Sequence, residues 1–225
     1  MASIKAVILD IDGTLILSND AHARAYVEAA EAVGLRGDYQ TVRRLIGKGS
    51  DKLIPEAFAV SSESEKGRQL EKLKGEIFKA KHLASLQSAP GVRALLTRLQ
   101  AEKKKLIVAT SAGKDDVAAL LDRAGVRDLV DDIVSSDDVD ASKPDPDVVQ
   151  VAIRKSGEDK ENAIMLGDTP YDVEAAQRAG IRIVAVRCGG WRDEDLAGAV
   201  AVYEDPADVL RHYSSTQRPV FAHDS

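Results

Sequence analysis

The chain has 225 residues, of which 44% are hydrophobic and 30% are charged. This composition excludes a disordered chain and leaves room for one domain with an insertion or for two modest domains. The formal net charge of −6 argues against a general nucleic-acid binder, because such proteins carry a basic excess. No apolar stretch reaches the roughly 18 residues that a membrane-spanning helix requires.

The single cysteine, Cys188, excludes a disulfide bond within the chain and favours a reducing compartment. We interpret it as a small apolar residue near the end of a strand, because no second cysteine or Cys/His spacing accompanies it. Residues 1–9 carry Lys5 and do not resemble a secretory signal. We therefore expect a soluble, cytoplasmic protein, a monomer or weak homodimer, with neither nucleic acid nor a membrane as partner.

In chain order, short continuous apolar runs predict buried strands at residues 6–9, 106–109, 133–134, 163–166 and 181–186. Apolar residues at helical spacing predict helices over residues 91–101, 116–124 and 147–155. The last helix is predicted to have Asp145 as its cap and Pro146 as its first residue. Strands that alternate with helices indicate an α/β fold with a parallel sheet covered on both faces, and ligands bind such sheets at the carboxyl ends of the strands.

Residues 19–86 break this alternation, because their apolar residues have helical spacing and no strand pattern is convincing. We predict an all-helical insertion at 19–86 in a sheet domain formed by residues 1–18 and 87–225. Residues 15–18 and 84–90 are the predicted linkers. The tail, residues 214–225, is predicted to be frayed or loosely docked.

Polar side chains follow the predicted strands at the edge where ligands bind. Asp10 and Asp12 follow the first strand, Thr110 the second and Asp168 the fourth, and Lys143 precedes Pro144 in a loop. Alone, each has a common structural explanation, such as a turn aspartate, a helix-capping threonine or a surface lysine. Together, Asp10 and Asp168 suit a cation that binds oxygen, for which Mg²⁺ fits best because the chain has no His/Cys cluster suited to zinc. Lys143 and Thr110 offer a positive charge and a hydroxyl to phosphate oxygens.

These residues stand in an ordered set of motifs: Asp10-Ile11-Asp12-Gly13-Thr14, Thr110, Lys143-Pro144, and Gly167-Asp168 with Asp172. In this set the chain resembles the haloacid dehalogenase-like hydrolases over nearly its whole length. The resemblance implies a Rossmann-like three-layer core, a helical cap inserted after the first motif, and required Mg²⁺. It also implies that Asp10 is the nucleophile that forms an aspartyl-phosphate, that Asp12 is the general acid and base, and that Thr110 and Lys143 hold the phosphate. The implied metal ligands are Asp10, Asp168 and the backbone carbonyl of Asp12.

The role implied for Asp12 requires a carboxyl group with a partly raised pKa. An aspartate at this place also favours phosphate esters, since dehalogenating and phosphonate-cleaving relatives lack it. Asp172 either holds a metal-bound water or caps the helix that begins near Pro170. Ser111 is expected to bind the substrate phosphate at a helix start, and Thr14 is expected to do likewise.

A cap that closes over the site excludes water and selects a small substrate. Residues 45–50 resemble the substrate-facing loop of relatives that act on phosphoglycolate and sugar phosphates, where Lys48 meets a substrate carboxylate or hydroxyl; a solvated turn lysine is the alternative. His22 matches a histidine near the active site of the sugar-phosphate mutases, and a structural histidine is the alternative. Trp191 and Arg192 either border the site or pack against the fold.

The motifs predict an Mg²⁺-dependent phosphomonoesterase that hydrolyses a small phosphorylated metabolite, phosphoglycolate-like or sugar-phosphate-like, through Asp10. A sugar phosphomutase is the alternative within the family, but Ser50 stands where those enzymes carry a phosphate-binding arginine. A receiver-like signalling module also combines an acceptor aspartate, a threonine or serine, a lysine and Mg²⁺, yet it needs neither Asp12 nor a cap. Loss of activity has no support, since all expected catalytic side chains are present.

Overall fold

Six parallel strands form the sheet of the computed structural model, which describes residues 3–213. Their order is β3-β2-β1-β4-β5-β6, and every neighbouring pair is parallel. The strands are Ala6–Leu9 (β1), Lys105–Ala109 (β2), Asp132–Val134 (β3), Ala163–Gly167 (β4), Arg182–Val186 (β5) and Ala201–Tyr203 (β6). This is the strand order of the Rossmann fold, so the predicted α/β class with a Rossmann-like core is confirmed.

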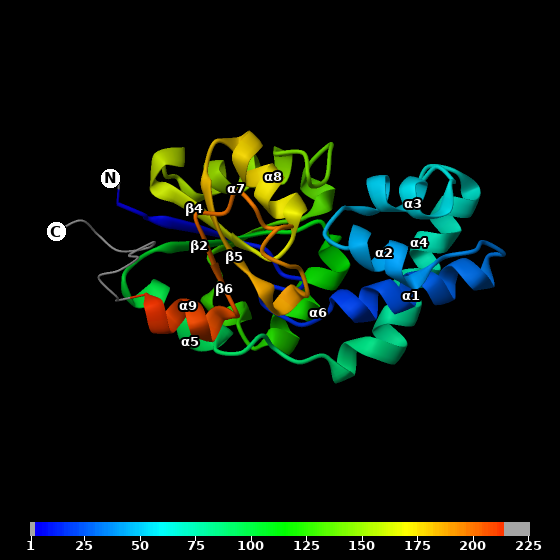
Figure 1. The fold of residues 1–225 in the computed structure, drawn as a ribbon, viewed down its shortest axis with the longest axis horizontal. Helices are drawn as coiled ribbons and strands as arrows, with labels where there is room; N and C mark the ends of the chain where they lie inside the picture. The colour runs from blue at the N-terminus through cyan, green and yellow to red at the C-terminus, as the bar shows by residue number, and fades with distance from the viewer. Residues whose placement is uncertain (1–2, 214–225) are drawn as a thin grey trace.

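Helices cover both faces of the sheet and complete three layers (Figure 1). Helices α7 and α8 cover one face, and α5, α6 and α9 cover the other. They span Val92–Ala101 (α5), Lys114–Ala124 (α6), Asp147–Ser156 (α7), Pro170–Ala179 (α8) and Pro206–His212 (α9). Strand β1 is apolar throughout because both of its faces are buried. Ala6 and Ile8 pack on the α7–α8 side, and Val7 and Leu9 pack on the other side.

The helices between β1 and α5 stand together in Figure 1, beyond the carboxyl ends of the strands. They are Asn19–Ala32 (α1), Tyr39–Leu45 (α2), Ser50–Phe58 (α3) and Glu65–Ile77 (α4), followed by a π-helical turn at Phe78–His82 and a 3₁₀ turn at Leu83–Ser85. Side-chain caps explain where two of them begin. Asp38 accepts a hydrogen bond from the Thr41 N–H at the start of α2, and Ser64 accepts one from the Gly67 N–H at the start of α4.

The two connections between these helices and the sheet run antiparallel and are hydrogen-bonded to each other. The Leu17 N–H donates to the Gln87 carbonyl and the Ala89 N–H donates to the Leu15 carbonyl, both at 2.9 Å. The paired connections hold the base of the helical part together. No helix within residues 3–213 is long and apolar enough to cross a membrane.

The structure departs from the predicted elements in two places. Strand β6 and helix α9, which have three and seven residues, were not predicted. Strand β3 is as short as β6, but its Ile133-Val134 pair before Ser135-Ser136 marks it as a strand. The prediction for the start of α7 was wrong: the helix begins at Asp147, after Pro146, and Asp145 does not cap it. Asp145 instead pairs with Lys52 at 2.9 Å and with Arg178 at 3.0 Å. The predicted loose tail lies outside the described residues.

The buried position of β2 leads to a stability prediction. Leu106 is fully buried in the core, whereas Leu17 on a linker is 39% exposed. We expect Leu106→Ala to lower the free energy of unfolding by about 2–5 kcal/mol, because the cavity it leaves is not filled. The matched change Leu17→Ala should cost about 0.5 kcal/mol or less. Urea unfolding followed by circular dichroism measures both, and equal losses would contradict this assignment of the core.

Candidate active site

The polar residues predicted at the strand ends do converge. Asp10 follows β1, Thr110 follows β2 and Asp168 follows β4, and β1 pairs directly with both other strands. Lys143 joins them from the loop before α7, and all four side chains are buried. The order of strands reverses at β1, and this switch point is where ligands bind in such sheets.

Lys143 is wholly buried, and its ammonium group lies between two carboxylates. Its Nζ donates to Asp10 Oδ1 at 2.6 Å and lies 2.8 Å from Asp172 Oδ1. Burial would lower the pKa of Lys143, but the charges of Asp10 and Asp172 outweigh it and raise the pKa above its ordinary value. Lys143 therefore stays charged and can also attract an anion.

Asp10, Asp168 and Asp172 form an acidic cluster in which one oxygen from each carboxylate lies within 4.8 Å of the others. Burial, with the neighbouring charges of Asp10 and Asp172, raises the pKa of Asp168 well above its ordinary value. Burial also raises the pKa of Asp10 to about 7, although Lys143 opposes the shift. A buried, oxygen-only donor set with more carboxylates than cations fits a divalent metal ion.

Asp168 is held in place by several neighbours. Thr14 Oγ1 donates to its Oδ1 at 3.0 Å, and Asn19 Nδ2 donates to its Oδ2 at 2.9 Å. The backbone of Gly189 approaches so closely that a Cβ there would lie 1.6 Å from Asp168 Oδ2, so only glycine fits. Asn19 and Gly189 are supporting residues that sequence reasoning missed, because nothing in their local sequence links them to Asp168.

Thr14 was predicted to bind substrate, but its hydrogen bonds are made within the protein. Its side chain is completely buried and bonds to Asp168, and its N–H donates to the Ile11 carbonyl at 3.2 Å. Both of its donors therefore serve the protein. Thr14 positions a carboxylate of the acidic cluster rather than facing the cavity.

Asp172 caps helix α8, as one of its two predicted roles required. Its Oδ2 accepts hydrogen bonds from the Thr169 N–H at 3.0 Å and the Thr169 hydroxyl at 2.8 Å, and Thr169 Oγ1 accepts one from the Asp172 N–H at 3.1 Å. This is a capping box, with Pro170 as the first residue of the helix. The other carboxylate oxygen faces Lys143, so the cap also fixes the position of that oxygen. A contact between Asp172 and a metal-bound water stays a prediction.

The carboxylate of Asp12 lies outside the acidic cluster. Its Oδ1 accepts a hydrogen bond from Ser18 Oγ at 2.5 Å and lies 2.8 Å from His22 Nε2. Burial alone would raise the pKa of Asp12, but His22, Ser18 and the charge of Lys74 outweigh burial and lower the pKa to about 2. The expected partly raised pKa was therefore wrong for this arrangement, because His22 and Lys74 of the insertion and Ser18 of the preceding linker stabilise the carboxylate.

A cavity of about 190 Å³ lies over Asp10 and Asp12, between the sheet and the helical insertion. Its sheet side is formed by the residues after β2 and β3, and its other side by α1, α4 and the segment between α2 and α3. The predicted residues Thr110, Ser111, His22 and Lys48 all line it. A site this small fits a metabolite rather than a macromolecular substrate.

The loop between α2 and α3 brings Lys48 and its neighbours to this cavity. Lys48 Nζ pairs with Glu56 and lies 4.9 Å from the centre of the Tyr171 ring. Ser111 Oγ donates to the Gly47 carbonyl at 3.2 Å, so the residue after Thr110 contacts this loop directly. Lys48 lines the cavity, while its ammonium contacts Glu56 and Tyr171, which do not line it, and a contact with substrate stays a prediction.

Lys74 of α4 is a cavity residue that the sequence did not reveal. Its ammonium lies 5.1 Å from the Tyr26 ring centre and 5.4 Å from that of Phe78, on which His22 stacks at 4.0 Å. Burial lowers the pKa of Lys74, while the charges of nearby carboxylates oppose the shift. Lys74 is one of several lysines along a polar helix, so only its packing against aromatic rings distinguishes it.

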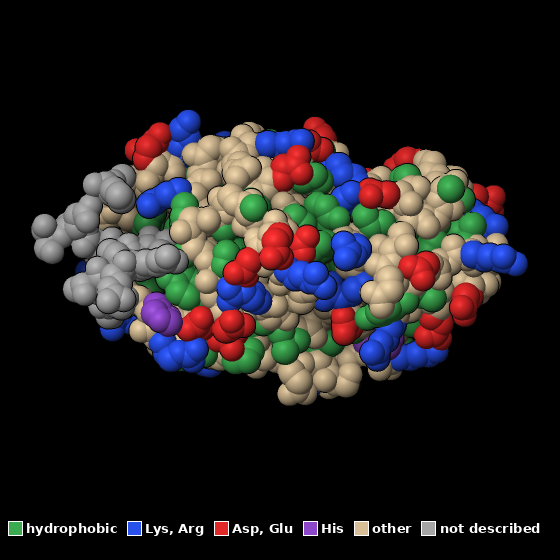
Figure 2. Space-filling model, in the orientation of Figure 1, with side chains coloured by type: hydrophobic (Ala, Val, Ile, Leu, Met, Phe, Trp, Pro, Cys, Tyr) green, Lys and Arg blue, Asp and Glu red, His purple; other side chains and the backbone are tan. Residues whose placement is uncertain are grey.

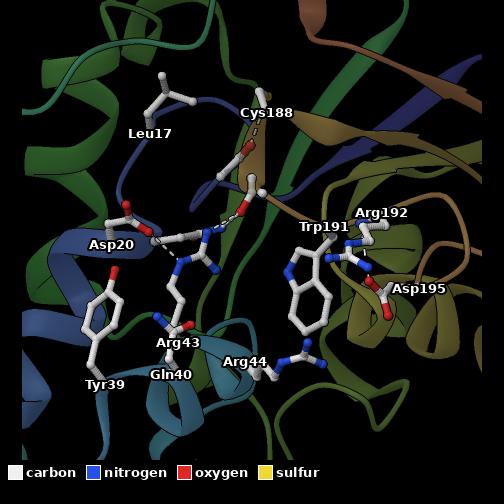
Figure 3. A pocket seen from close by; sticks show the side chains of 14 residues that line it. Leu17, Asp20, Tyr39, Gln40, Arg43, Arg44, Cys188, Trp191, Arg192 and Asp195 are labelled. Atoms are coloured by element: carbon white, nitrogen blue, oxygen red, sulfur yellow. Dashed lines mark hydrogen bonds and ion pairs between the residues drawn. The ribbon is translucent and has the colours of Figure 1, made fainter.

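Trp191 and Arg192 were predicted either to border the site or to pack against the fold. They line a separate cavity beside Asn19 and Gly189, between α2 and the segment after β5 (Figure 3). This second cavity shares no lining residue with the cavity over Asp10 and Asp12, which we call the catalytic cavity. Cys188 also borders it and is half-buried, and its thiol donates to the Gly13 carbonyl at 3.1 Å.

A Rossmann-like sheet that gathers carboxylates, a lysine and a threonine at the ends of its central strands defines an α/β enzyme with an anion- and metal-binding site. Residues 7–186 match the haloacid dehalogenase-like hydrolase family, and the chain belongs to that family. The family predicted from the motifs is thereby confirmed, and with it the prediction of a hydrolytic enzyme.

Individual relatives cover nearly the whole chain. The chain is 31% identical over 215 residues to a phosphoglycolate phosphatase from Rhodospirillum rubrum, covering 91% of this chain and 89% of the relative. It is 30% identical over 185 residues to a validoxylamine A 7′-phosphate phosphatase from Streptomyces hygroscopicus subsp. limoneus, covering 81% and 85%. A crystal structure of a hydrolase from Pseudomonas syringae matches 92% of this chain and 97% of its own with a TM-score of 0.86 and 30% identity.

The acidic cluster leads to a prediction about metal binding. Mg²⁺ at about 100 times its dissociation constant should stabilise the protein by roughly 2.7 kcal/mol, which raises the unfolding temperature by about 5–10 °C. Asp168→Asn should abolish this rise, because it removes a ligand charge. Without Mg²⁺ the variant should be at least as stable as the wild type, because it relieves repulsion between buried carboxylates. Differential scanning fluorimetry with and without MgCl₂ measures both, and an equal rise in the variant would exclude this metal site.

Proposed function

We propose that the protein is an Mg²⁺-dependent phosphomonoesterase that hydrolyses a small phosphorylated metabolite through an aspartyl-phosphate on Asp10. The observation that carries the proposal is the buried Lys143 ammonium, 2.6 Å from Asp10 and beside the acidic cluster, beneath a small cavity. A carboxylate attacks a phosphate only where the negative charges of both are neutralised. The similarity to two phosphatases supports the same reaction.

In the proposed reaction, an oxygen of Asp10 forms a bond to phosphorus while the bond from phosphorus to the ester oxygen breaks. Lys143 and Thr110 hold the phosphate oxygens, and Asp12 supplies the proton to the leaving alcohol. Asp12 then takes a proton from water, whose oxygen attacks the phosphorus and releases phosphate and Asp10. A bound Mg²⁺ would supply positive charge to the transferring phosphoryl group and would be held by Asp10, Asp168 and the Asp12 carbonyl, with Asp172 near its waters.

The lowered pKa of Asp12 adds a condition to this reaction. At neutral pH the carboxyl group is ionised while it pairs with His22 and Ser18. A phosphate dianion beside Asp12 raises the pKa of Asp12 by repulsion and favours its protonated form. Proton delivery by Asp12 is therefore coupled to the arrival of substrate.

The proposed substrate is a small phosphate ester with a second polar group, either a carboxylate, as in phosphoglycolate, or sugar hydroxyls. Lys74 and Lys48, whose ammonium pairs with Glu56, line the cavity, as does His22, which pairs with Asp12. The phosphatase names of two relatives favour hydrolysis over a mutase reaction. Ser50 also lines the cavity, at the place where a mutase would need a residue for the second phosphate. We also propose a cytoplasmic location, which the single free cysteine favours.

The catalytic prediction uses a matched pair of variants. Purified protein with Mg²⁺ should release phosphate from p-nitrophenyl phosphate, and Asp10→Asn should lower kcat by about 10³-fold or more, because the amide does not attack phosphorus. Asp159→Asn, an exposed change before β4 at the opposite end of the strands, should leave kcat within about twofold.

Unchanged turnover in Asp10→Asn would exclude the mechanism. A receiver-like module would instead form a long-lived adduct with acetyl phosphate and show no turnover, which rapid quenching detects. A panel that includes phosphoglycolate and hexose phosphates distinguishes the proposed substrate classes by kcat/KM.

We further propose that residues 19–86 act as the cap and that Lys52 fastens the cap to the loop of Lys143. Lys52 Nζ donates to the Ser142 carbonyl and pairs with Asp145 at 2.9 Å. The Ser142 hydroxyl donates to Asp51 at 2.5 Å and accepts from the Gly49 N–H at 3.1 Å. The loop that carries Lys143 is therefore a docking surface for the segment that carries Lys48.

Loss of this docking leads to a kinetic prediction. Lys52→Met should raise KM by about tenfold, because the loss of one charge-assisted hydrogen bond weakens the closed form by about that factor. The change in kcat should be smaller. Lys66→Met removes an exposed lysine of α4 and should leave both constants unchanged. Steady-state kinetics on the best substrate of the panel measures the effect. Identical KM values for the two variants would show that Lys52 has no part in closing the cap.

A further inference from the structure

The cavity beside Asn19 and Gly189 has no part in the proposed reaction, although its volume of about 610 Å³ is larger than that of the catalytic cavity. One side is formed by α2, with Arg43 and Arg44, and the other by the segment after β5, with Trp191 and Arg192 (Figure 3). We call it the arginine groove. Its volume is in the range of pockets that bind small organic molecules.

The arginine groove is basic in a chain with a net charge of −6. Arg43 is neutralised by Asp20, with Nε 2.6 Å from its carboxylate, and also donates to the Gly189 carbonyl. The guanidinium groups of Arg44 and Arg192 are exposed and make no hydrogen bond or ion pair in the described part of the chain, whereas Asp195, which also lines the groove, accepts from the Arg192 backbone N–H at 3.3 Å. Figure 2 shows Lys and Arg side chains beside Asp and Glu side chains near the middle of the visible face, where the helical insertion meets the sheet. Two planar five-donor cations that face one cavity suit carboxylate or phosphate groups.

Trp191 supplies a second, independent observation. It is half-buried with its ring edge-on to Tyr171 at 6.0 Å, and its Nε1–H is buried without a hydrogen-bond acceptor in the described part of the chain. A buried donor without a partner destabilises the fold. Asn19 also lines the groove and is buried, with an exposed fraction of 3%. Its Oδ1 likewise has no hydrogen-bond partner in the described part of the chain. Both atoms are inaccessible to solvent, so the indole ring, rather than its N–H, is the part of Trp191 that a ligand in the groove contacts.

We propose that the arginine groove is a binding site for a small organic polyanion, separate from the catalytic site. Arg44 and Arg192 bind its carboxylate or phosphate groups, and Trp191 provides an apolar surface. Because Arg44 belongs to the insertion and Arg192 to the sheet domain, one ligand contacts both. This assignment holds whether or not the proposed phosphatase activity is correct.

The test uses Trp191, which is the only tryptophan in the chain and so reports on the groove directly. Citrate and pyrophosphate are titrated separately against the full-length protein without Mg²⁺, in 150 mM NaCl, while tryptophan fluorescence is recorded. These probes distinguish a carboxylate from a phosphate source. Isothermal calorimetry with the same probes detects binding that leaves the fluorescence unchanged. We expect a saturable change for at least one probe with a dissociation constant of about 1 mM or lower.

The double variant Arg44→Gln with Arg192→Gln should weaken this binding at least tenfold. Its control, Arg24→Gln with Arg36→Gln, removes the same charge from exposed positions outside the groove and should bind as the wild type does. Both double variants should retain phosphate release from p-nitrophenyl phosphate within about twofold, which shows that they fold. The absence of saturable binding up to 10 mM by both methods, or equal weakening in both double variants, would overturn the proposal.

Discussion

Asp10, Asp168 and Asp172 lie buried within 4.8 Å of one another, and Lys143 is the cation that contacts two of them. Charges buried in this way are costly unless they are paired and hydrogen-bonded, so the surrounding structure is organised to pair them. The central strands carry the carboxylates to one edge of the sheet. Thr14 and Asn19 donate to Asp168, and the capping box of α8 holds Asp172. The excess negative charge that remains suits a divalent cation, and Lys143 offers positive charge to an anion.

The helical insertion controls the other half of the chemistry. His22 and Ser18 pair with Asp12 and lower its pKa, so the proposed proton carrier is regulated by residues outside the sheet. Lys48 and Lys74 come from two different parts of the insertion and meet only at the cavity. Lys52 connects the same insertion to the loop of Lys143. The proposed catalytic residues of the sheet domain and the insertion residues His22, Lys48 and Lys74 therefore line one small cavity, and their relative position depends on contacts across it.

Much of the fold could be predicted from sequence, because strands buried on both faces are continuously apolar and amphipathic helices keep their period. Strand β6 has only three residues and lacks a pair such as the Ile133-Val134 of the equally short β3, and α9 has seven residues, too few to show a helical period. The cap of α7 was wrongly assigned to Asp145, since an aspartate before a proline is a common cap and its partner Lys52 lies 93 positions away in the chain, in a different helix. Thr14 was predicted to bind substrate because its motif places it near phosphate, yet its hydroxyl is used by Asp168.

The sequence by itself determined the identity and order of the reactive residues, since Asp10, Asp12, Thr110, Lys143 and Asp168 each follow or precede a recognisable local element. It also determined the sheet, whose pattern is local and periodic. Only the tertiary structure decided the lowered pKa of Asp12, the part that Lys74 has in the cavity wall, and the grouping of Arg44, Trp191 and Arg192 around a second cavity. Charge interactions, burial and cavities depend on distances between residues far apart in the chain, and those distances exist only once the insertion has packed against the sheet.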